Sequence, residues 1–416
     1  MSGARETALK ALYEVEKNGA YSDKALKNAL RGGALAPTDR AFAAELTYGV
    51  VRHKSRLDFI IRNYSDQRLK KLSVWILNIL RMGVYQMIFL DKIPHSAAVN
   101  EGVNLAKRYG HEASARFVNA VLRAVSRGGD VKCPSLNIYY SHPDWLVDLI
   151  DAQYPLECKK ILAANNEIPA VTVRVNTLKT TSGALCDALT KKGIEVTPRG
   201  ELLEIAKFGD IAALEEYKNG LFTPQDKGAY LAAAAVDPRP GELILDVCAA
   251  PGGKATQIAE MSGDKAKILA FDLHAHKIDL INKNARRLGI NGITAICRDA
   301  AQPDPQYIAA ADKVLADVPC SGLGVIRKKP DIKWRKTPGD LKEIIALQSA
   351  VLDSSARYLK PGGILVYATC TINKDENGGV VERFLQTARF EKLKETQLLP
   401  HTDGCDGFYI CKLRKK

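Results

Sequence analysis

Two cysteines and one aspartate in the C-terminal third of the chain have types and spacing that could support covalent chemistry. Asp317 and Cys320 stand three residues apart in ADVPCSG, and Cys370 ends the apolar run VYATC. A thiolate can attack an electron-poor carbon, and a second thiol can carry a proton. A carboxylate can hold the nitrogen edge of a planar ring by hydrogen bonds. The set predicts catalysis on an anionic, planar substrate.

Methylation of cytosine at carbon 5 is a reaction that uses such a pair of thiols. Carbon 5 is a poor nucleophile, but a thiolate that adds at carbon 6 makes the ring enamine-like, so that carbon 5 can attack a methylsulfonium. The proton on carbon 5 must then leave and the thiol must be expelled, for which a second acid or base helps. Asp317 would hold and stabilise the protonated base. The pattern alone does not decide which cysteine attacks.

A basic stretch with one tryptophan follows Cys320 closely. Lysines and arginines crowd residues 327–336, and Trp334 lies among them. Positive charge beside a cysteine favours thiolate over thiol, and it also attracts phosphates. We therefore expect residues 327–336 to hold the phosphates of the substrate.

From residue 221 onward the chain alternates between strand-like and helical stretches. The strand-like runs are LILDV, AKILAFDL, ITAICRD, KVLADV and GILVYAT. This alternation predicts an α/β fold, a doubly wound Rossmann-like sheet with ligands beyond the carboxyl ends of its strands. The fourth and fifth runs should be neighbours, so Cys320 and Cys370 should lie at the same edge of the sheet.

A glycine-rich turn follows the first of these runs, in LDVCAAPGGKATQ. Gly252 and Gly253 allow a ligand to approach the backbone, and the amides that open the next helix supply donors. Asp272 ends the second run and can accept hydrogen bonds from ribose hydroxyls, while Asp299 after the third can meet an adenine amino group. The turn is not GxGxxG, so S-adenosylmethionine is the predicted ligand rather than a dinucleotide.

The chain before residue 221 divides into two further regions. Residues 1–130 are predicted as an all-helical domain, because SVWILNILRMGVYQMIFL and its neighbours carry apolar stripes at helical spacing. Residues 139–220 are predicted as a small α/β module with strands at AVTVRVNTL and EVTP. Residues 221–416 form the third predicted domain.

Composition narrows the class of protein. Sixty basic against forty-seven acidic residues leave a net charge of +13 in 416 residues, which favours nucleic acid as partner. No run approaches the ~18 apolar residues of a membrane span and no signal peptide is evident, so we expect a cytoplasmic protein without a membrane partner. The nine cysteines include no CxxC pair, which predicts no metal site and no disulfide framework. Cys297 is expected in the core.

Several segments closely resemble the RNA cytosine-5 methyltransferases of the NOL/NOP/Sun family. They are DVCAAPGGK, DVPCSG, ATCT followed by DEN, and the terminal DGFYI, joined by RVNTLKT and TPQDKGAYLAA. The resemblance covers about residues 139–416, where it implies an RRM-like module and a methyltransferase domain. The helical region before it looks like a NusB-type RNA-binding domain. The combination is similar to bacterial 16S rRNA methyltransferases, which implies small-subunit (16S) ribosomal RNA as substrate; we expect a monomer.

The resemblance also implies individual roles. Cys370 would be the covalent nucleophile, and Cys320 would aid product release. The S-adenosylmethionine site would be lined by Asp272, Asp299, Asp317 and the turn residues Cys248, Ala249, Ala250, Pro251, Gly252, Gly253 and Lys254. The segment with Arg174 and Asn176 would contact RNA. One departure is visible, because the serine that the family carries shortly after Gln225 and Asp226 is absent here.

Two alternatives stay open from the sequence. In a DNA cytosine-5 methyltransferase the proline-cysteine thiol attacks, which would make Cys320 the nucleophile. A non-catalytic RNA-binding factor for ribosome assembly or antitermination is the second alternative, in which the sheet is a relic. The intact turn, both thiols and Asp317 argue against the relic.

Overall fold

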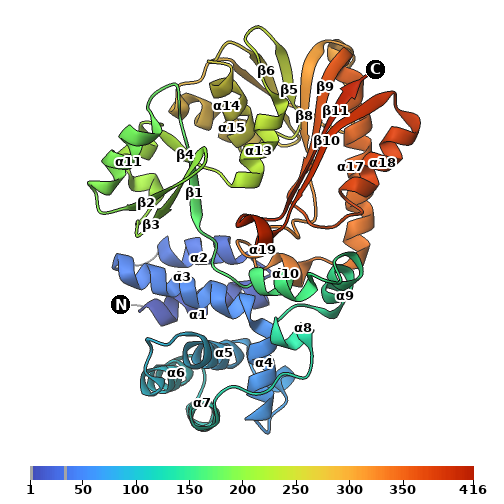
Figure 1. The fold of residues 1–416 in the computed structure, drawn as a ribbon. Coiled ribbons are helices and arrows are strands. Elements are labelled where there is room, and N and C mark those ends of the chain that lie inside the picture. Colours follow the sequence, from blue (N-terminus) through green and yellow to red (C-terminus); the bar gives the residue numbers. More distant parts are fainter. Residues whose placement is uncertain (1–2, 32–34) are drawn as a thin grey trace. The chain divides into compact units, whose positions relative to one another are not determined.

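A computed structural model describes residues 3–31 and 35–416, which form two compact units (Figure 1). The first unit holds the residues up to 167 together with a short segment, 326–335, from much later in the chain. The second unit holds residues 168–325 and 336–416. No helix in the described residues is long and apolar enough to cross a membrane.

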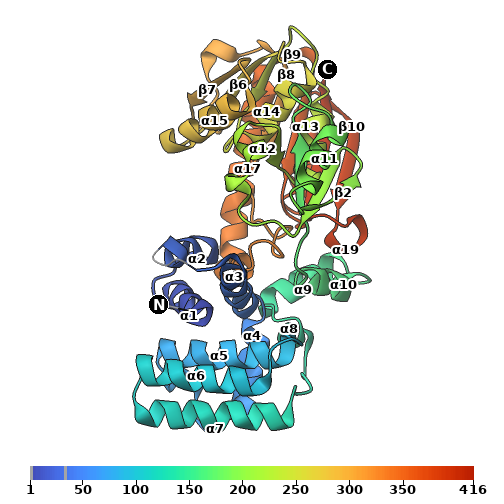
Figure 2. The same cartoon turned by 90° about the vertical axis from the view of Figure 1, so that its left-hand side faces the viewer.

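The first unit is helical, which was predicted for residues 1–130, and its helices continue to Ala164. Its helices are α1 (Ala4–Lys17), α2 (Ser22–Arg31), α3 (Pro37–Arg52), α4 (Lys54–Asn63), the 3-10 turn η1 (Leu69–Lys71), α5 (Val74–Phe89), α6 (His95–Tyr109), α7 (Glu112–Gly128), α8 (Leu136–Tyr139), α9 (Asp144–Gln153) and α10 (Cys158–Ala164). The most apolar helix, α5, begins after Ser73, whose side chain accepts a hydrogen bond from the Ile76 amide. It packs beside α6 and α7 (Figure 2). Leu9, Leu12 and Val121 also lie in this core.

The segment 326–335, which we call the strap, packs into the first unit. It contains the short helix α16 (Ile332–Arg335). Lys333 is fully buried, and its Nζ donates to the Arg52 carbonyl at 2.7 Å and to Asn166 Oδ1 at 3.2 Å. Burial and the charge of Arg52 lower the pKa of Lys333 well below its ordinary value. The indole nitrogen of Trp334 donates to the Val51 carbonyl at 2.7 Å.

We expected the basic side chains of residues 327–336 to hold phosphates. For Arg327, Lys333 and Arg335 this expectation is wrong. Arg327 is buried, Lys333 is buried among oxygen acceptors, and Arg335 donates to the Gly19 carbonyl at 2.6 Å. The reason is that Trp334 and its neighbours gain more by burial against helices than by exposure, and the charges next to them are then satisfied by main-chain oxygens.

The second unit begins with a small antiparallel sheet of order β2-β3-β1-β4. Its elements are β1 (Val171–Val175), α11 (Ser182–Thr190), β2 (Glu195–Arg199), β3 (Leu202–Ala206), η2 (Ile211–Ala213), α12 (Glu215–Lys218) and β4 (Phe222–Pro224). The predicted strands β1 and β2 are present. The other two were not predicted, because β4 has only three residues and β3 follows β2 after a two-residue turn, so neither shows a separate alternation.

The rest of the unit is a seven-stranded sheet of order β10-β11-β9-β8-β5-β6-β7. Its strands are β5 (Leu243–Asp246), β6 (Lys267–Asp272), β7 (Ile293–Cys297), β8 (Ala311–Asp317), β9 (Leu359–Thr369), β10 (Phe390–Leu398) and β11 (Phe408–Lys415). The five predicted runs are β5 to β9, which are parallel to one another, and the predicted α/β fold is confirmed. The antiparallel strands β10 and β11 extend the sheet beyond β9.

Helices cover both faces of the large sheet (Figure 1). They are α13 (Lys227–Val236), α14 (Gly253–Met261) and α15 (Ala275–Leu288) on one face, and α17 (Pro338–Tyr358) and α18 (Gly378–Thr387) on the other, with the short turns η3 (Pro305–Tyr307) and α19 (Pro400–Asp403) in the connections. The two faces carry separate apolar cores. This doubly wound arrangement brings the carboxyl ends of β5 to β9 to one edge, where the site residues follow.

Candidate active site

The two cysteines singled out by the sequence meet at the edge of the large sheet. Strand β8 pairs in parallel with β9, and Asp317 is the register partner of Ala368. The chain continues from each strand by a few residues to Cys320 and Cys370. Their sulfur atoms lie 3.1 Å apart, joined by a hydrogen bond. The expectation that both thiols lie at one edge of the sheet is therefore confirmed.

A buried carboxylate holds the two cysteine-bearing turns together. Glu376 has no exposed surface and accepts hydrogen bonds from both turns. The Ser321 amide and hydroxyl donate to it at 2.8 and 2.6 Å. Asn373 Nδ2 and Gln348 Nε2 add bonds of 3.1 Å each, and the Thr371 hydroxyl lies at 3.4 Å. Sequence reasoning quoted Glu376 within DEN and gave it no role; its position five residues after an adjacent Cys-Thr pair was the available signal.

Two glycines allow the turn after Cys320 to approach the rest of the site. The Gly324 amide donates to the Cys370 carbonyl at 3.1 Å, and the Gly407 amide donates to the Gly324 carbonyl at 2.9 Å. A Cβ on Gly324 would lie only 2.0 Å from the Gly407 carbonyl oxygen, so no side chain fits there. The glycine of the DGFYI motif is thus explained by close backbone packing around the cysteines.

Asp317, the third predicted catalytic residue, forms an ion pair with Lys254 of the glycine-rich turn. Both side chains are about one-fifth exposed, at 19% each. Burial would lower the pKa of Lys254, but the negative charges of Asp317 and Asp246 and its interaction with Cys370 outweigh burial and raise that pKa. The lysine is therefore a charged ammonium at neutral pH, placed between the turn and the thiols.

The glycine-rich turn leaves space for a ligand. Gly252 caps α14 with φ +100°, and its amide donates to the Ala249 carbonyl at 2.7 Å, which closes the turn. A Cβ on Gly253 would meet nothing within 4 Å, so no protein atom occupies that side of the helix start. Asp272 accepts a hydrogen bond from the Ala250 amide at 3.3 Å and fixes the turn against the end of β6.

Asp246 at the end of β5 is a site residue that sequence reasoning missed. It is 1% exposed, and both of its carboxylate oxygens lack a hydrogen-bond partner within the described residues. Burial raises the pKa of Asp246 to about 7, against the opposing charge of Lys254, while Asp317 and Asp272 raise it further. An acid directly before the turn in LDVCAAPGGK was the signal for it.

These features fit the predicted cofactor. S-adenosylmethionine carries hydroxyl and amino donors, and the buried Asp246 oxygens are free to accept. Open space beside Gly253 and the unpaired amides of the first turn of α14 would receive an anionic group. Asp272 and Asp317 provide further acceptors at neighbouring strand ends.

The other three predicted residues, Cys248, Asp299 and Cys297, have different environments. Burial raises the pKa of the Cys248 thiol well above its ordinary value, and the charge of Asp246 adds to this, which makes Cys248 unreactive. Asp299 is exposed, and it accepts a hydrogen bond from the Ala301 amide two residues later rather than from the glycine-rich turn. Cys297 is exposed, so the expectation that it lies in the core is wrong: β7 is an edge strand, and the thiol donates to the Leu273 carbonyl.

The Cys320 thiol differs from an ordinary cysteine. Its hydrogen bond with Cys370 and its burial raise the pKa of Cys320 well above the usual value, and the negative charges of Glu376 and Asp317 add to the effect. Cys320 therefore keeps its proton at neutral pH.

Arg174 and Asn176, expected in a segment that contacts RNA, are both buried. Arg174 is 3% exposed and forms an ion pair with Glu260 at 2.8 Å. The Asn176 amide donates to the Gly220 and Leu288 carbonyls at 2.9 Å each. Their side chains are thus unavailable to RNA, and they hold the small sheet against α14 and the end of α15.

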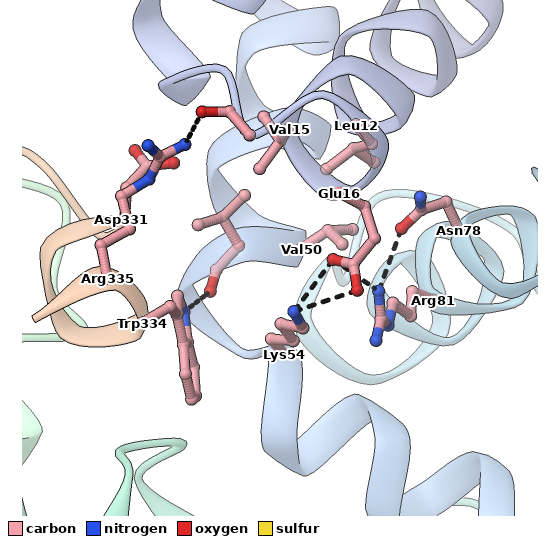
Figure 3. Close-up of a pocket in the computed structure, with 12 residues that line it drawn as sticks. Leu12, Val15, Glu16, Val50, Lys54, Asn78, Arg81, Asp331, Trp334 and Arg335 are labelled. Atoms are coloured by element: carbon pink, nitrogen blue, oxygen red, sulfur yellow. Dashed lines mark hydrogen bonds and ion pairs between the residues drawn. The ribbon is translucent and has the colours of Figure 1, made fainter. Parts of the chain in front are cut away.

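A cavity of about 300 Å³ lies within the first unit (Figure 3). Its polar lining pairs internally: Glu16 accepts from Lys54 at 2.9 Å and lies 3.5 Å from Arg81, which donates to Asn78 at 3.2 Å. Trp334 of the strap forms one wall. The cavity thus lies between the helices and the strap, and Glu16, Lys54 and Arg81 in its lining are paired with one another.

Known families match the chain in three successive parts. Residues 2–127 match the NusB family, and residues 142–208 match the ferredoxin-like domain of RsmF/B-like methyltransferases. Residues 233–414, which carry the cysteines and the glycine-rich turn, match the family described as 16S rRNA methyltransferase RsmB/F. No group of three or more potential metal ligands is present in the described part of the chain.

Relatives match over the whole length. A protein named "Probable ribosomal RNA small subunit methyltransferase B" from Bacillus subtilis is 38% identical over 445 residues, covering 100% of this chain and 99% of the relative. A protein of the same name from Synechocystis is 37% identical and covers 100% of both chains. The chain belongs to the ribosomal RNA small subunit methyltransferase B family. The solved structure titled "Crystal Structure of PH0851" has a TM-score of 0.83 at 25% identity and covers 99% of this chain and 98% of its own.

Family membership settles the broad activity. The protein is an S-adenosylmethionine-dependent ribosomal RNA methyltransferase with a NusB-like helical domain, a ferredoxin-like module and a Rossmann-like catalytic domain. The predicted fold class, family and cofactor are therefore confirmed.

Proposed function

We propose that the protein transfers a methyl group to carbon 5 of a cytosine in 16S ribosomal RNA through a covalent cysteine-cytosine intermediate, in the cytoplasm. The observation that carries the proposal is the pair of sulfurs 3.1 Å apart, beside the Asp317–Lys254 ion pair and the glycine-rich turn. A nucleophile and a proton carrier converge on one position, as carbon 5 methylation requires. We also propose the domain limits 1–130, 139–220 and 221–416.

In the proposed reaction Cys370 adds to carbon 6 and Asp317 holds the nitrogen edge of the base. A carbon-sulfur bond forms at carbon 6 while the ring double bond shifts its electron pair to carbon 5. S-adenosylmethionine supplies an electrophilic methyl group to that carbon. The carbon 5 proton then leaves, the carbon-sulfur bond breaks, and the electron pair of the departing proton restores the ring double bond as Cys370 is released.

The different environments of the two cysteines support this division of roles. The raised pKa of Cys320 keeps it as a thiol, which suits a proton carrier better than a nucleophile. Lys254 interacts electrostatically with Cys370, so a cation stands beside the proposed nucleophile. Glu376 holds Cys320 and Cys370 on adjoining turns, so the proton carrier stays next to the bond that must break.

The proposed cofactor site consists of residues 248–254, Asp272, Asp299 and Asp317, to which the structure leads us to add Asp246. Asp246 and Asp272 supply buried carboxylates at adjacent strand ends. The turn supplies backbone amides and the open side of Gly253. Asp299 is exposed, so it would contact the cofactor only at the solvent-facing border of the site.

Trapping of the covalent adduct tests the cysteine roles. Cys320→Ala is expected to accumulate a protein-RNA adduct that survives denaturing electrophoresis, because release is impaired. Cys370→Ala is expected to form none. An adduct in Cys370→Ala and none in Cys320→Ala would falsify the assignment and make Cys320 the nucleophile, as in the DNA enzymes.

Mapping of the modified base tests the reaction itself. Labelled methyl from S-adenosylmethionine should appear as 5-methylcytosine in unmodified 16S RNA incubated with the protein. Transfer to a different atom would refute carbon 5 chemistry. No transfer to RNA, free or in a partly assembled small subunit, would instead favour the non-catalytic assembly factor.

A further inference from the structure

Arg174 makes an unusually complete set of bonds for a residue outside the active site. It lies on β1 of the small sheet, and all three of its guanidinium nitrogens are engaged. Nε and Nη2 form a two-bond fork with Glu260 at 2.9 and 2.8 Å, and Nη2 also donates to the Thr256 hydroxyl at 3.1 Å. Nη1 donates to the Gly253 carbonyl at 2.8 Å. Three of the partners therefore lie on α14, the helix that the glycine-rich turn opens.

The bond to Gly253 has a direct consequence for the turn. The Gly253 carbonyl and the Lys254 amide belong to one planar peptide group, and in a trans peptide they point in opposite directions. Fixing the carbonyl therefore fixes the direction of the amide. Amides of the first helical turn have no partner within the helix and are the groups that bind an anionic ligand. Arg174 binds the carbonyl on one side of this peptide group and thereby orients the Lys254 amide on the other side, toward the ligand.

Gln225 extends the network of hydrogen bonds around Arg174, which we call the brace. Its side-chain oxygen accepts a hydrogen bond from Arg174 Nη1, and its nitrogen donates to Gln257 Oε1 at 2.6 Å. Gln257 in turn donates to the Tyr230 carbonyl at 3.0 Å. The chain of bonds runs from the small sheet through α14 to α13, and every side chain in it is at least nine-tenths buried. The segments RVNTLKT and TPQDKGAYLAA thereby meet at the back of the turn.

We infer that Arg174 is a positioning residue for the cofactor, through which the ferredoxin-like module sets the affinity for S-adenosylmethionine. The guanidinium suits this role because its planar fork binds a carboxylate with two bonds and still has a nitrogen left for a main-chain oxygen. A lysine has one nitrogen and cannot satisfy both. The inference rests on the proposed role of the glycine-rich turn in cofactor binding.

The test compares Arg174→Lys with Asn176→Ala in the full-length protein. Both residues are buried on the same side of the small sheet, but Asn176 bonds to Gly220 and Leu288 and not to the turn. Calorimetric Kd for S-adenosylmethionine should rise about tenfold in Arg174→Lys, the effect of one lost charge-assisted hydrogen bond. KM for the cofactor should rise with it, and kcat at saturating cofactor should change by less than about threefold. Asn176→Ala should lower the thermal midpoint but keep Kd within about twofold of wild type.

Equal Kd in Arg174→Lys and wild type, or equal weakening in both variants, would overturn the inference and leave Arg174 a structural residue only. If Arg174→Lys does not fold, Thr256→Val removes the hydroxyl that both accepts from Arg174 and donates to Gly253, with little change in volume. It should raise Kd about threefold, and an unchanged Kd would count against the brace. The proposed reaction can fail separately, by methylation of another atom, while Kd still decides this question.

Discussion

Replacing Glu376 with glutamine should separate the two cysteine-bearing turns. The carboxylate accepts five hydrogen bonds without exposed surface, and an amide nitrogen cannot accept. Hydroxyls of Ser321 and Thr371 can reverse to accept, but amide donors cannot. In one orientation glutamine therefore cannot accept the hydrogen bond that Asn373 Nδ2 donates to Glu376. In the other it leaves both the Ser321 amide and Gln348 Nε2.

The less costly orientation loses this one buried hydrogen bond and weakens the other bonds, which the negative charge had strengthened. Together these cost about 2–4 kcal/mol of unfolding free energy. The charge of Glu376 also raises the pKa of Cys320, so its removal lowers that pKa. The pH profile of Cys320 alkylation, followed by mass spectrometry, should therefore move to lower pH. Methyl transfer should fall about tenfold or more, because the thiols lose their fixed separation.

Asp375→Asn is the matched control, since it removes the same charge one residue away on an exposed side chain. Its denaturant midpoint and its alkylation profile should stay close to those of wild type. If Glu376→Gln behaves like Asp375→Asn in both measurements, Glu376 does not hold the turns and the reasoning fails.

Two further predictions concern the cofactor side of the site. In Gly253→Ala the new methyl group would contact no protein atom within 4 Å, so the thermal midpoint should equal or exceed that of wild type. If the ligand occupies that space, the affinity for S-adenosylmethionine measured by calorimetry should drop at least tenfold. An unchanged affinity would show that Gly253 is not part of the site. Asp246 has a folded-state pKa of about 7, above its ordinary value of 3.8, so the protein binds this proton more tightly when folded and loses stability as pH rises from about 4 through 7. Asp246→Asn without cofactor should therefore gain unfolding free energy over wild type at pH 8 and differ little at pH 4, and a loss at pH 8 would contradict the unpaired buried carboxylate.

The positions of the proposed catalytic residues could be predicted because these residues directly follow strands whose order is local along the chain. Parallel strands end at one edge of a sheet, so Asp317, Cys320 and Cys370 had to approach one another once β8 and β9 were neighbours. The glycine-rich turn is likewise a local signal. Strands β10 and β11 were not predicted. Strand β10 is mostly polar and exposed, so it lacks the apolar pattern that identified β5 to β9.

Features that depend on distant packing could not be derived. Lys333 looks like a surface cation in sequence, and only the packing of Trp334 against α3 explains why its Nζ is buried and donates to the Arg52 carbonyl and Asn166 Oδ1. Arg174 looks equally like an RNA contact until Glu260, 86 residues later, is placed opposite it. A buried acid such as Glu376 has no signature of its own, because its five donors come from segments up to 55 residues away.

The strap makes the chain that follows Cys320 part of the helical first unit. Six residues after Cys320 the polypeptide joins the first unit, and it returns to the second at Lys336. A fragment starting at residue 168 would retain Lys333 and Trp334 but lose Arg52, Val51 and Asn166, the residues that accept their hydrogen bonds. Cutting the chain at the start of the second unit would therefore leave Lys333 Nζ and the Trp334 indole without these partners, on the loop that follows Cys320.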